Sequence, residues 1–502
     1  MKKIYKLIFT VMAMLMVLTP AFTSVAQAAD TTTTSSSSSA TTTVSDDSLA
    51  KIKAKGEIVL GTSPDYPPYE FMAKGKVVGM DVEIAKKIAK DMGVKLVIKK
   101  MSFDSLLVAL QTGKVDIVIS GVNPTAKRAK SVDFSKSYYK AGQYILINKS
   151  DKGVYKNRNS FSGKQLGAQT GSLPYNLAKS HSKGATVKGM DTVSDLVIAL
   201  KSHKVEGVVL DEPTAKAYAA NDSSIVAVDG QFDLGSDETN DVVAVAKGST
   251  SLTNEINKSI TDIKSNDLIS GYLKTAGSYM DTNTANTSMW HYWKYFALGI
   301  KYTIGISAIS VVLGFLIGVL LAFMRLSKVK LFKWIGTAYV EFVRGTPLMV
   351  QILFVYFGLG VIVNIPAVIS GIIAVSLNSG AYICEVIRGG ILSIDKGQDE
   401  AARSLGLNSN DTMFSVVLPQ AIRNIWPALG NEFVSLIKET SIVSIIGVSD
   451  MIYQLKIVQA DTYRGVIPIV ITMILYFILT FVITRILRYY EVKMNSKMNR
   501  KV

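Results

Sequence analysis

Cysteine is almost missing from this sequence, because its 502 residues include only Cys384. One cysteine cannot form a disulfide within the chain or supply a thiolate zinc cluster, and its apolar sequence neighbours argue against a redox role. Charged residues are also scarce, at 19%, whereas 48% of the residues are hydrophobic and the mean hydropathy is +0.28. The chain therefore contains more apolar sequence than an ordinary soluble enzyme buries in its core.

A phosphate-binding loop of the type G-x-x-x-x-G-K-[ST] is missing as well. Gly-Lys pairs occur at 75–76, 113–114 and 163–164, but each is followed by Val or Gln instead of Ser or Thr. The chain is therefore predicted not to be an enzyme that hydrolyses ATP, and neither a bound cofactor nor a metal site is expected on it.

The N-terminal 48 residues predict two segments that precede any folded domain. Residues 1–28 have the pattern of a secretory signal peptide, since three lysines precede an apolar run over 7–18 and a small-x-small site lies at 26–28. An uncleaved first membrane helix is the alternative. Residues 29–48 are almost entirely Ser, Thr and Ala, which cannot bury a core, so they predict a linker. Because no cysteine follows the apolar run, no lipid anchor is expected.

Residues 49–280 have the pattern of an exported α/β domain with two lobes. Short β-rich runs alternate with helical segments. The expected strands lie at 58–60, 96–98, 116–119, 208–210 and 242–245, and examples of the expected helices lie at 81–92, 103–111 and 193–201. Two crossover strands, near 138–142 and 238–242, are expected to act as the hinge between the lobes.

The residues after 280 predict an all-α membrane domain. A polar connector over 281–293 ends in aromatic residues, as at a membrane surface, and the domain itself is expected over 294–490. Five transmembrane helices are expected, at 302–324, 334–363, 367–387, 422–448 and 465–484. A basic tail follows at 491–502.

The net charge of +16, from 55 Lys+Arg and 39 Asp+Glu, is explained by the orientation of these spans. Basic residues cluster after the first, third and fifth spans, whereas the turns near 364 and 450–464 carry few. The positive-inside rule therefore predicts a multi-pass protein of the cell membrane with residue 290 outside and residue 502 in the cytoplasm. The signal peptide independently requires export of the α/β domain. No nucleic-acid partner is expected.

Four motifs of the α/β domain identify it with a known family. GTSPDYPPYEF occupies 61–71, GMDVEI 79–84, ALQTGKVD 109–116 and RAKSVDF 128–134. In this order and spacing they closely resemble the polar amino-acid solute-binding proteins of ABC importers, over about residues 50–277. The resemblance implies a type II periplasmic-binding-protein-like fold that closes on a free amino acid.

The same resemblance implies roles for individual residues. A guanidinium fork matches a carboxylate in a bidentate way, so Arg128 is expected to bind the ligand's carboxylate. The backbone and hydroxyl groups that complete this carboxylate site are expected from Ser120, Gly121, Asn123, Thr170 and Ser172. Asp211 is expected to bind the α-ammonium, and its alternative role is to cap the helix before Pro213.

Four further residues are expected around the ligand's side chain. Tyr66 and Phe103 match the aromatic pair that sandwiches the ligand, with ordinary core packing as the alternative. Ser63 and Gln169 match positions that vary with selectivity. Because several binders of cationic amino acids or glutamine carry an acid at the Ser63 position, the sequence leaves the preferred amino acid open.

The membrane domain contains a cytoplasmic loop with a strong signature. Glu400, Ala401 and Ala402 are followed after three residues by Gly406 and then by VVLP at 416–419. This spacing resembles the EAA loop of ABC permeases, and EFVRGTP at 341–347 and NEF at 431–433 resemble the polar amino-acid permease subfamily. The resemblance covers about 290–490. It implies that a short helix ending at Gly406 docks into a separate ATPase subunit, which binds ATP-Mg.

Charged residues inside the spans are candidates for lining a translocation path, since they are costly in lipid. These are Glu385, Glu432, Lys438 and Glu439. Structural pairing at a dimer interface is the alternative, and Glu341 is expected to pair with Arg344. Five spans are too few for a closed path, so a homodimer is predicted. The predicted function is the binding and permease subunit of an importer for a glutamine-like, asparagine-like or cationic amino acid. A ligand-gated channel and an amino-acid sensor are the alternatives.

Overall fold

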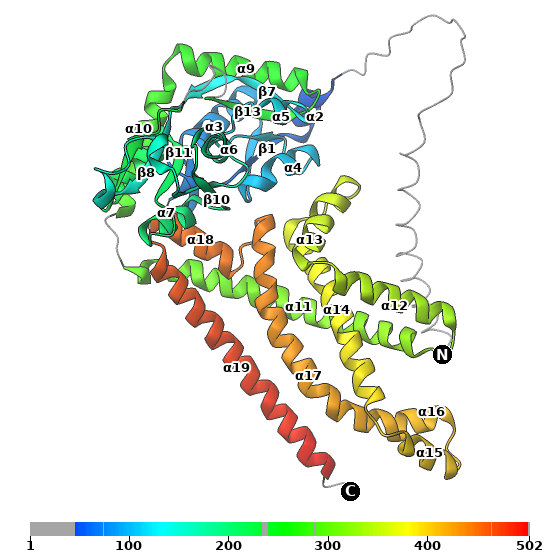
Figure 1. Ribbon diagram of the computed structural model, residues 1–502. Coiled ribbons are helices and arrows are strands. Elements are labelled where there is room, and N and C mark those ends of the chain that lie inside the picture. Colours follow the sequence, from blue (N-terminus) through cyan, green and yellow to red (C-terminus); the bar gives the residue numbers. More distant parts are fainter. Residues whose placement is uncertain (1–45, 74, 233–238, 285–287, 463, 500–502) are drawn as a thin grey trace, which may run out of the picture. The chain divides into compact units, whose positions relative to one another are not determined.

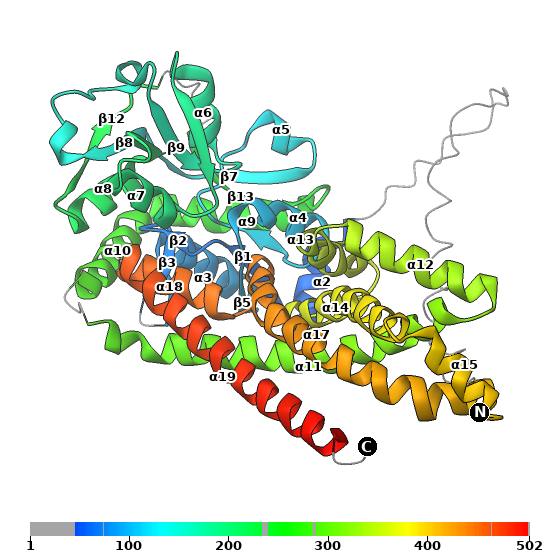
Figure 2. The same cartoon turned by 60° about the horizontal axis from the view of Figure 1, so that its bottom comes forward.

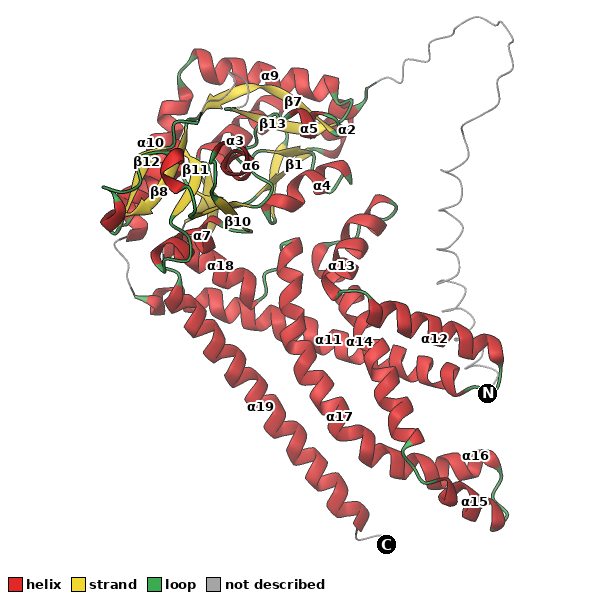
Figure 3. Ribbon diagram, in the orientation of Figure 1, coloured by secondary structure: helices red, strands yellow, loops and turns green. Residues whose placement is uncertain are grey.

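The computed structural model describes residues 46–73, 75–232, 239–284, 288–462 and 464–499. The predicted signal peptide and nearly all of the predicted linker lie outside the described residues, as does part of the second predicted hinge segment. Among these described residues, Figure 3 shows strands only in the α/β domain, and the part that follows it contains helices and loops.

The α/β domain contains two five-stranded sheets, one in each lobe. Lobe 1 is built on the order β5-β1-β6-β13-β7, and lobe 2 on the order β10-β9-β11-β8-β12. In lobe 1 the strands are β5 (Lys95–Lys100), β1 (Glu57–Thr62), β6 (Ile117–Val118), β13 (Asn240–Ala246) and β7 (Val132–Lys140). In lobe 2 they are β10 (Thr186–Met190), β9 (Gln165–Gln169), β11 (Gly207–Asp211), β8 (Gln143–Asn148) and β12 (Ile225–Asp229).

The strand pairing places the first crossover between the lobes, at residues 141–142, where the sequence predicts it. β1 pairs in parallel with β5 and β6, whereas β13 runs antiparallel to β6 and β7. The chain leaves lobe 1 after β7 and enters lobe 2 at β8, and it returns from β12 to β13. A small antiparallel sheet of β2 (Asp65–Tyr66), β3 (Glu70–Ala73) and β4 (Lys76–Val78) extends lobe 1.

Helices cover the sheets, and α3 (Met80–Met92) illustrates why they form where they do (Figure 1). Ile84, Ile88 and Met92 recur at a spacing of four and are buried, whereas Lys86 is exposed. Gly93 ends the helix in the left-handed conformation at φ 70°, where glycine carries no steric penalty. Burying each large aliphatic side chain contributes roughly 1.5–3 kcal/mol.

The other α-helices of the domain divide between the two lobes. In lobe 1 they are α2 (Ser48–Lys55), α4 (Leu106–Gln111), α5 (Ala126–Ala129), α9 (Thr250–Ser265) and α10 (Leu268–Thr284). In lobe 2 they are α6 (Leu173–His181), α7 (Val193–Lys201) and α8 (Glu212–Asn221). Thr192 caps α7, since its hydroxyl accepts the Asp195 N–H at 3.1 Å.

The membrane part contains three helices that are long and apolar enough to span a bilayer, within the described residues. They lie in Met289–Leu326, Ala367–Leu392 and Val466–Lys493. Two further spans are present if each of two bent helix pairs counts as one, which gives the predicted five. The main helices of these candidate spans are α11 (Trp293–Leu326), α12 (Lys330–Gly345), α13 (Leu348–Leu353), α14 (Ala367–Leu392), α17 (Leu418–Glu439), α18 (Met451–Thr462) and α19 (Val466–Asn499).

The second predicted span, at 334–363, is not one straight helix. It bends by 105° between α12 and α13. Pro347 lacks a backbone N–H and disfavours a helical conformation at the residue before it, and Thr346 is indeed extended at φ −116° and ψ 140°. The fifth predicted span also differs, because α19 continues past residue 484 to Asn499 and so includes most of the predicted tail.

Small residues allow α11 and α14 to pack along each other (Figures 1 and 2). A Cβ atom on Gly318 of α11 would lie 2.6 Å from Ile383 Cγ2, and one on Gly380 of α14 would lie 2.6 Å from Ile317 Cγ2. Both contacts require glycine. This is the packing expected of membrane helices, where close backbone approach replaces a hydrophobic driving force.

Candidate functional site

Eight of the predicted ligand-binding residues line one small cavity between the two lobes. From lobe 1 these are Tyr66, Phe103, Ser120, Gly121 and Asn123, and from lobe 2 they are Gln169, Ser172 and Asp211. The two sets come from strand ends and adjoining turns, so the fold brings together residues that are up to 145 positions apart in the sequence. Pro174, Val209 and Leu210 complete the lining.

Asp211 ends β11 with its side chain in the cavity wall. The Tyr66 hydroxyl donates to Asp211 Oδ2 at 2.9 Å and accepts the Asp211 backbone N–H at 3.0 Å, while Gln143 donates to Oδ1. Burial raises the pKa of Asp211 to about 6. Asp211 occupies the N-cap position of α8, but its side chain makes no capping hydrogen bond. The carboxylate is therefore directed to the cavity and not to the helix.

Three more buried acids, which were not predicted as site residues, support the cavity from lobe 1. Glu70 accepts the Ser120 hydroxyl at 2.6 Å, and Asp81 accepts the Gly121 N–H at 2.9 Å. Asp241 accepts the Asn123 amide at 3.2 Å. Each acid thus orients a cavity residue. Burial raises the pKa of Glu70 and Asp241, and raises that of Asp81 to about 6. Glu70 and Asp81 lie inside the motifs at 61–71 and 79–84, and this position is the sequence signal that could have identified them.

Arg128 bridges the lobes at the edge of this site. Its Nη1 donates to Asn123 O at 2.9 Å, and its Nη2 donates to Gly171 O at 3.0 Å in lobe 2. The guanidinium carbon lies 5.6 Å from the centre of the Phe103 ring. Arg128 is not among the residues that line the cavity itself. A ligand carboxylate would have to replace these two carbonyl acceptors.

Three predicted ligand-binding residues make hydrogen bonds within the protein: Ser63, Thr170 and Ser172. Ser63 donates its hydroxyl to Asp65 Oδ1 at 3.0 Å and does not line the cavity. Thr170 is exposed, and its N–H bonds Met190 O at 2.9 Å. The Ser172 hydroxyl lies in the cavity but accepts the Tyr175 N–H at 3.2 Å, which caps α6. Thr170 and Ser172 thus shape the lobe 2 turn.

Asp65 makes an interlobe contact that sequence reasoning missed. Its Oδ2 accepts the Val193 N–H at 3.0 Å, so a carboxylate of lobe 1 meets the positive end of α7 in lobe 2. Burial raises the pKa of Asp65 to about 6. Together with the Arg128–Gly171 and Tyr66–Asp211 bonds, this contact holds the two lobes in a closed arrangement.

The predicted coupling loop forms a short helix with an exposed apolar edge. Glu400 and Ala401 of α15 (Lys396–Ser404) are exposed, whereas Ala402 is buried. Gly406 is left-handed at φ +87°, and its N–H bonds Arg403 O at 2.9 Å, which ends the helix. Next to it Leu405 is 85% exposed. The loop therefore presents both apolar and polar groups to a partner.

Glu385 is surrounded by three arginines where α11, α12 and α14 meet. It pairs with Arg325, with Arg388 at 2.9 Å and with Arg344 at 3.5 Å. Among the described side chains, no ion pair joins Arg344 to Glu341, so the predicted Glu341–Arg344 pair is wrong; Arg344 instead reaches the more buried carboxylate. This arrangement favours the structural alternative for Glu385.

The other three charged candidates of the membrane domain lie together on α17. Lys438 and Glu439 are exposed, and Glu432 is half-buried. Charged side chains on the surface of an apolar domain need a polar path, or a second protein surface, to avoid lipid.

Two protein families match this chain, one for each part. Residues 58–275 match the bacterial extracellular solute-binding proteins, family 3, and residues 314–496 match the binding-protein-dependent transport system inner membrane component. A Rickettsia prowazekii permease named for glutamine transport is 43% identical over 34% of this chain and 80% of its own length.

Two relatives of the first part are binding proteins. The arginine-binding extracellular protein ArtP of Bacillus subtilis is 33% identical over 42% of this chain and 82% of its own length. An amino-acid ABC transporter substrate-binding protein of Streptococcus pneumoniae, crystallised with L-arginine, is 35% identical. It aligns with 46% of this chain and 98% of its own, with a TM-score of 0.45.

Proposed function

We propose that one polypeptide captures an amino acid and conducts it through the membrane. The premise is that this chain belongs to the family 3 solute-binding proteins and to the inner membrane components of binding-protein-dependent transport. The chain joins the amino-acid-binding and permease domains of an ABC importer. We call residues 49–280 the trap and residues 294–490 the permease domain. Neither family supports the channel or sensor alternative.

The observation that carries the proposal is the cavity with Asp211 in its wall and Arg128 at its edge. A free amino acid has an ammonium group that suits a buried carboxylate and a carboxylate that suits a guanidinium. Tyr66 and Phe103 add aromatic surface for the side chain. Glutamine and arginine are the first ligands to test, because relatives are named for each.

The trap is proposed to face the exterior and the basic C-terminal region the cytoplasm, with the first 28 residues directing export. The distribution of Lys and Arg supports this orientation, as do the exported solute-binding relatives. It also places the α15 loop on the cytoplasmic side, where ATP is available.

A separate ATPase subunit, which binds ATP-Mg, is proposed to dock on α15 through Glu400, Ala401, Ala402 and Gly406. The supporting observation is apolar exposure: Leu405 is 85% exposed and Phe414 is 60% exposed on the same loop. Such residues on a polar loop mark a protein-binding surface. The left-handed Gly406 fixes the angle at which the chain leaves the helix.

Two copies of the permease domain are proposed to form the path. The exposed Lys438 and Glu439, with Glu432 on the same helix, support this assignment, because a second copy would remove them from lipid and enclose a polar route between two α17 helices. Each path would then carry two traps.

Ligand-stimulated ATP hydrolysis tests the function. The full chain is reconstituted in vesicles with its ATPase, and L-glutamine and L-arginine are added separately. We expect at least one to stimulate hydrolysis and uptake. Gly406→Leu should abolish stimulation, because its backbone conformation is strained for a side chain. Gly389→Leu is the control, since a Cβ there meets nothing within 4 Å. Full stimulation with Gly406→Leu would contradict the coupling role.

A further inference from the structure

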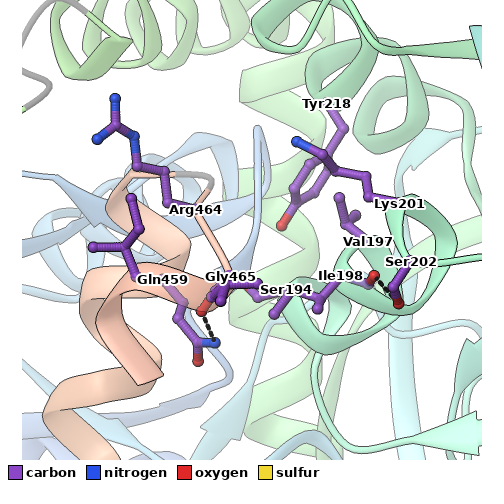
Figure 4. Close-up of a pocket in the computed structure, with 11 residues that line it drawn as sticks. Ser194, Val197, Ile198, Lys201, Ser202, Tyr218, Gln459, Arg464 and Gly465 are labelled. Atoms are coloured by element: carbon purple, nitrogen blue, oxygen red, sulfur yellow. Dashed lines mark hydrogen bonds between the residues drawn. The ribbon is translucent and has the colours of Figure 1, made fainter. Parts of the chain in front are cut away.

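A second cavity, of about 330 Å³, lies where α7 and α8 of lobe 2 meet the start of α19, and we call it the α7–α19 pocket. Figure 4 shows α7 on one side of it and the turn before α19 on the other. None of the residues that line it lines the amino-acid cavity. The α7–α19 pocket is therefore a separate candidate binding site.

Both charged side chains in the lining of this pocket are basic. Lys201 comes from α7 and Arg464 from the turn before α19. Lys201 also pairs with Asp222 Oδ2 at 2.5 Å, but Asp222 does not line the pocket. The start of α19 adds the positive end of a helix, because its first N–H groups have no acceptor within the helix and its first turn contains no acidic residue. The pocket therefore favours an anionic group.

Ser194 adds a polar group that the protein itself leaves unused. Its side chain is 8% exposed and lines the pocket. Within the part of the chain that the structure describes, its hydroxyl has no hydrogen-bond partner. Burying a hydroxyl without a partner is costly, so this position indicates a ligand that forms a hydrogen bond there.

The pocket also lies at the level where a membrane surface is expected. Val466, which begins α19 and lines the pocket, is 64% exposed. Trp290 is exposed just before α11, and nearby Tyr292 packs against Val458, the neighbour of the pocket residue Gln459. Exposed tryptophan at the end of a membrane helix marks the level of the lipid headgroups. The phosphate groups of the bilayer are therefore expected beside this pocket.

We propose that the α7–α19 pocket binds an anionic phospholipid of the leaflet on the trap's side of the membrane. Arg464 and Lys201 contact its phosphate, and the Ser194 hydroxyl donates a hydrogen bond to it. The acyl chains continue along the exposed apolar surface of α19. A free phosphate ion would leave that apolar surface, including Val466, in water. This lipid site goes beyond the importer function, because the amino acid binds in the other cavity.

Lipid binding to the purified full chain tests the proposal. Phosphatidylglycerol and phosphatidylcholine with the same acyl chains are added separately in detergent, and native mass spectrometry measures the affinity for each. Lys201→Gln with Arg464→Gln is the pocket variant. Lys204→Gln with Lys294→Gln is the control, because it removes two exposed basic groups that do not line the pocket. Amino-acid binding is measured on the same samples, so a failure of the importer function is seen separately.

We expect phosphatidylglycerol to bind at least tenfold more tightly than phosphatidylcholine. The pocket variant should weaken phosphatidylglycerol binding about 25-fold, since each Lys or Arg beside an anionic lipid contributes about fivefold. The control should stay within twofold of the wild type, because detergent offers no charged membrane surface. Equal affinity for the two lipids, an unchanged affinity in the pocket variant, or an equal loss in the control would overturn the proposal.

A second variant tests the site without changing its charge. Ser202 is exposed and lines the pocket, so Ser202→Phe places a ring inside it. Phosphatidylglycerol binding should fall at least fivefold, whereas Ser265→Phe, an exposed change at the end of α9, should bind as the wild type does. Wild-type affinity in Ser202→Phe would contradict the lipid site. Displacement of the lipid by millimolar inorganic phosphate would also contradict it and would assign the pocket to a free anion.

Discussion

The cleft of the trap and the arginine cluster of the permease domain stabilise carboxylates in different ways. In the trap, Asp211, Asp81 and Asp241 accept hydrogen bonds from hydroxyl, amide and backbone N–H groups. In the permease domain, Glu385 is paired with three arginines. Donors without charge stabilise a carboxylate only partly, whereas ion pairs neutralise it. We therefore expect the cleft to accept a cationic group and the arginine cluster to be a structural contact.

The largest effect is expected from removing the cleft charge. Asp211→Asn should weaken binding of the amino acid about 100-fold, close to 2.7 kcal/mol, because the ligand ammonium loses its counter-charge. Calorimetry on the full chain measures this. Asp229→Asn, an exposed change in the same lobe, should bind as the wild type does. A loss below fivefold for Asp211→Asn would mean that the cleft acids are structural too.

A change in the arginine cluster should affect stability and spare binding. Glu385→Gln leaves three arginines without their shared carboxylate and should destabilise the permease domain by about 2 kcal/mol. Thermal unfolding in nanodiscs reports the loss, with Glu341→Gln as the control. If Glu385→Gln keeps the wild-type melting temperature but lowers transport, Glu385 lines the translocation path.

Acid should weaken binding and favour the ligand-free trap. The pKa of Asp211 is raised from 3.8 to about 6 by burial, so the carboxyl takes up a proton as the pH falls through 6. Affinity should then fall by up to tenfold per pH unit below 6. The raised pKa has the opposite effect on folding, because the folded state binds more protons than the unfolded state between pH 3.8 and 6. Stability contributed by this group is therefore present at low pH and is lost as the pH rises through 6.

Binding and unfolding measured from pH 7 to pH 5 separate these two effects. The Asp211→Asn variant should show a smaller pH dependence of both quantities. Asp65 and Asp81, whose pKa values are also raised to about 6, titrate in the same range and remain in that variant. Affinity that rises on acidification would contradict the proposed ammonium contact.

The smallest effect is expected at the interlobe bond. Asp65→Ala removes the acceptor for the Val193 N–H and should weaken binding three- to tenfold, about 1 kcal/mol, because less of the closed state is stabilised. Asp104→Ala, an exposed change in lobe 1, is the control. Faster ligand release measured by stopped flow, with an unchanged association rate, would place the effect on reopening.

Sequence patterns predicted the features that depend on periodicity and on fixed motifs. The two-lobed α/β fold followed from alternating strands and helices, and the membrane helices followed from apolar runs. Tyr66, Gly121 and Asp211 were found because each belongs to a motif near a strand end. Their mutual contacts, such as the Tyr66–Asp211 bond, needed the folded chain.

The features that were missed depend on long-range geometry. Asp65 is one acid in a motif, and only the folded position of α7 shows that its side chain accepts a hydrogen bond from the other lobe. Asp241 lies in a strand whose apolar pattern hid its role. Pro347 was visible, but the strongly apolar residues around it suggested a continuous span. Arg344 has an acid three residues away, yet its partner lies on another helix.

The short covalent link between trap and permease has a kinetic consequence. Only residues 285–288 separate α10 from the turn that begins at Met289, so the trap stays with the permease domain of its own chain. A binding protein that is not tethered competes with other copies of itself for the permease. Empty copies are outnumbered in this competition when loaded copies accumulate. Here every encounter is with the same partner at a fixed high local concentration. Transport then saturates with the occupancy of the clefts that are tethered to each path, and making more protein adds paths and traps in a fixed ratio.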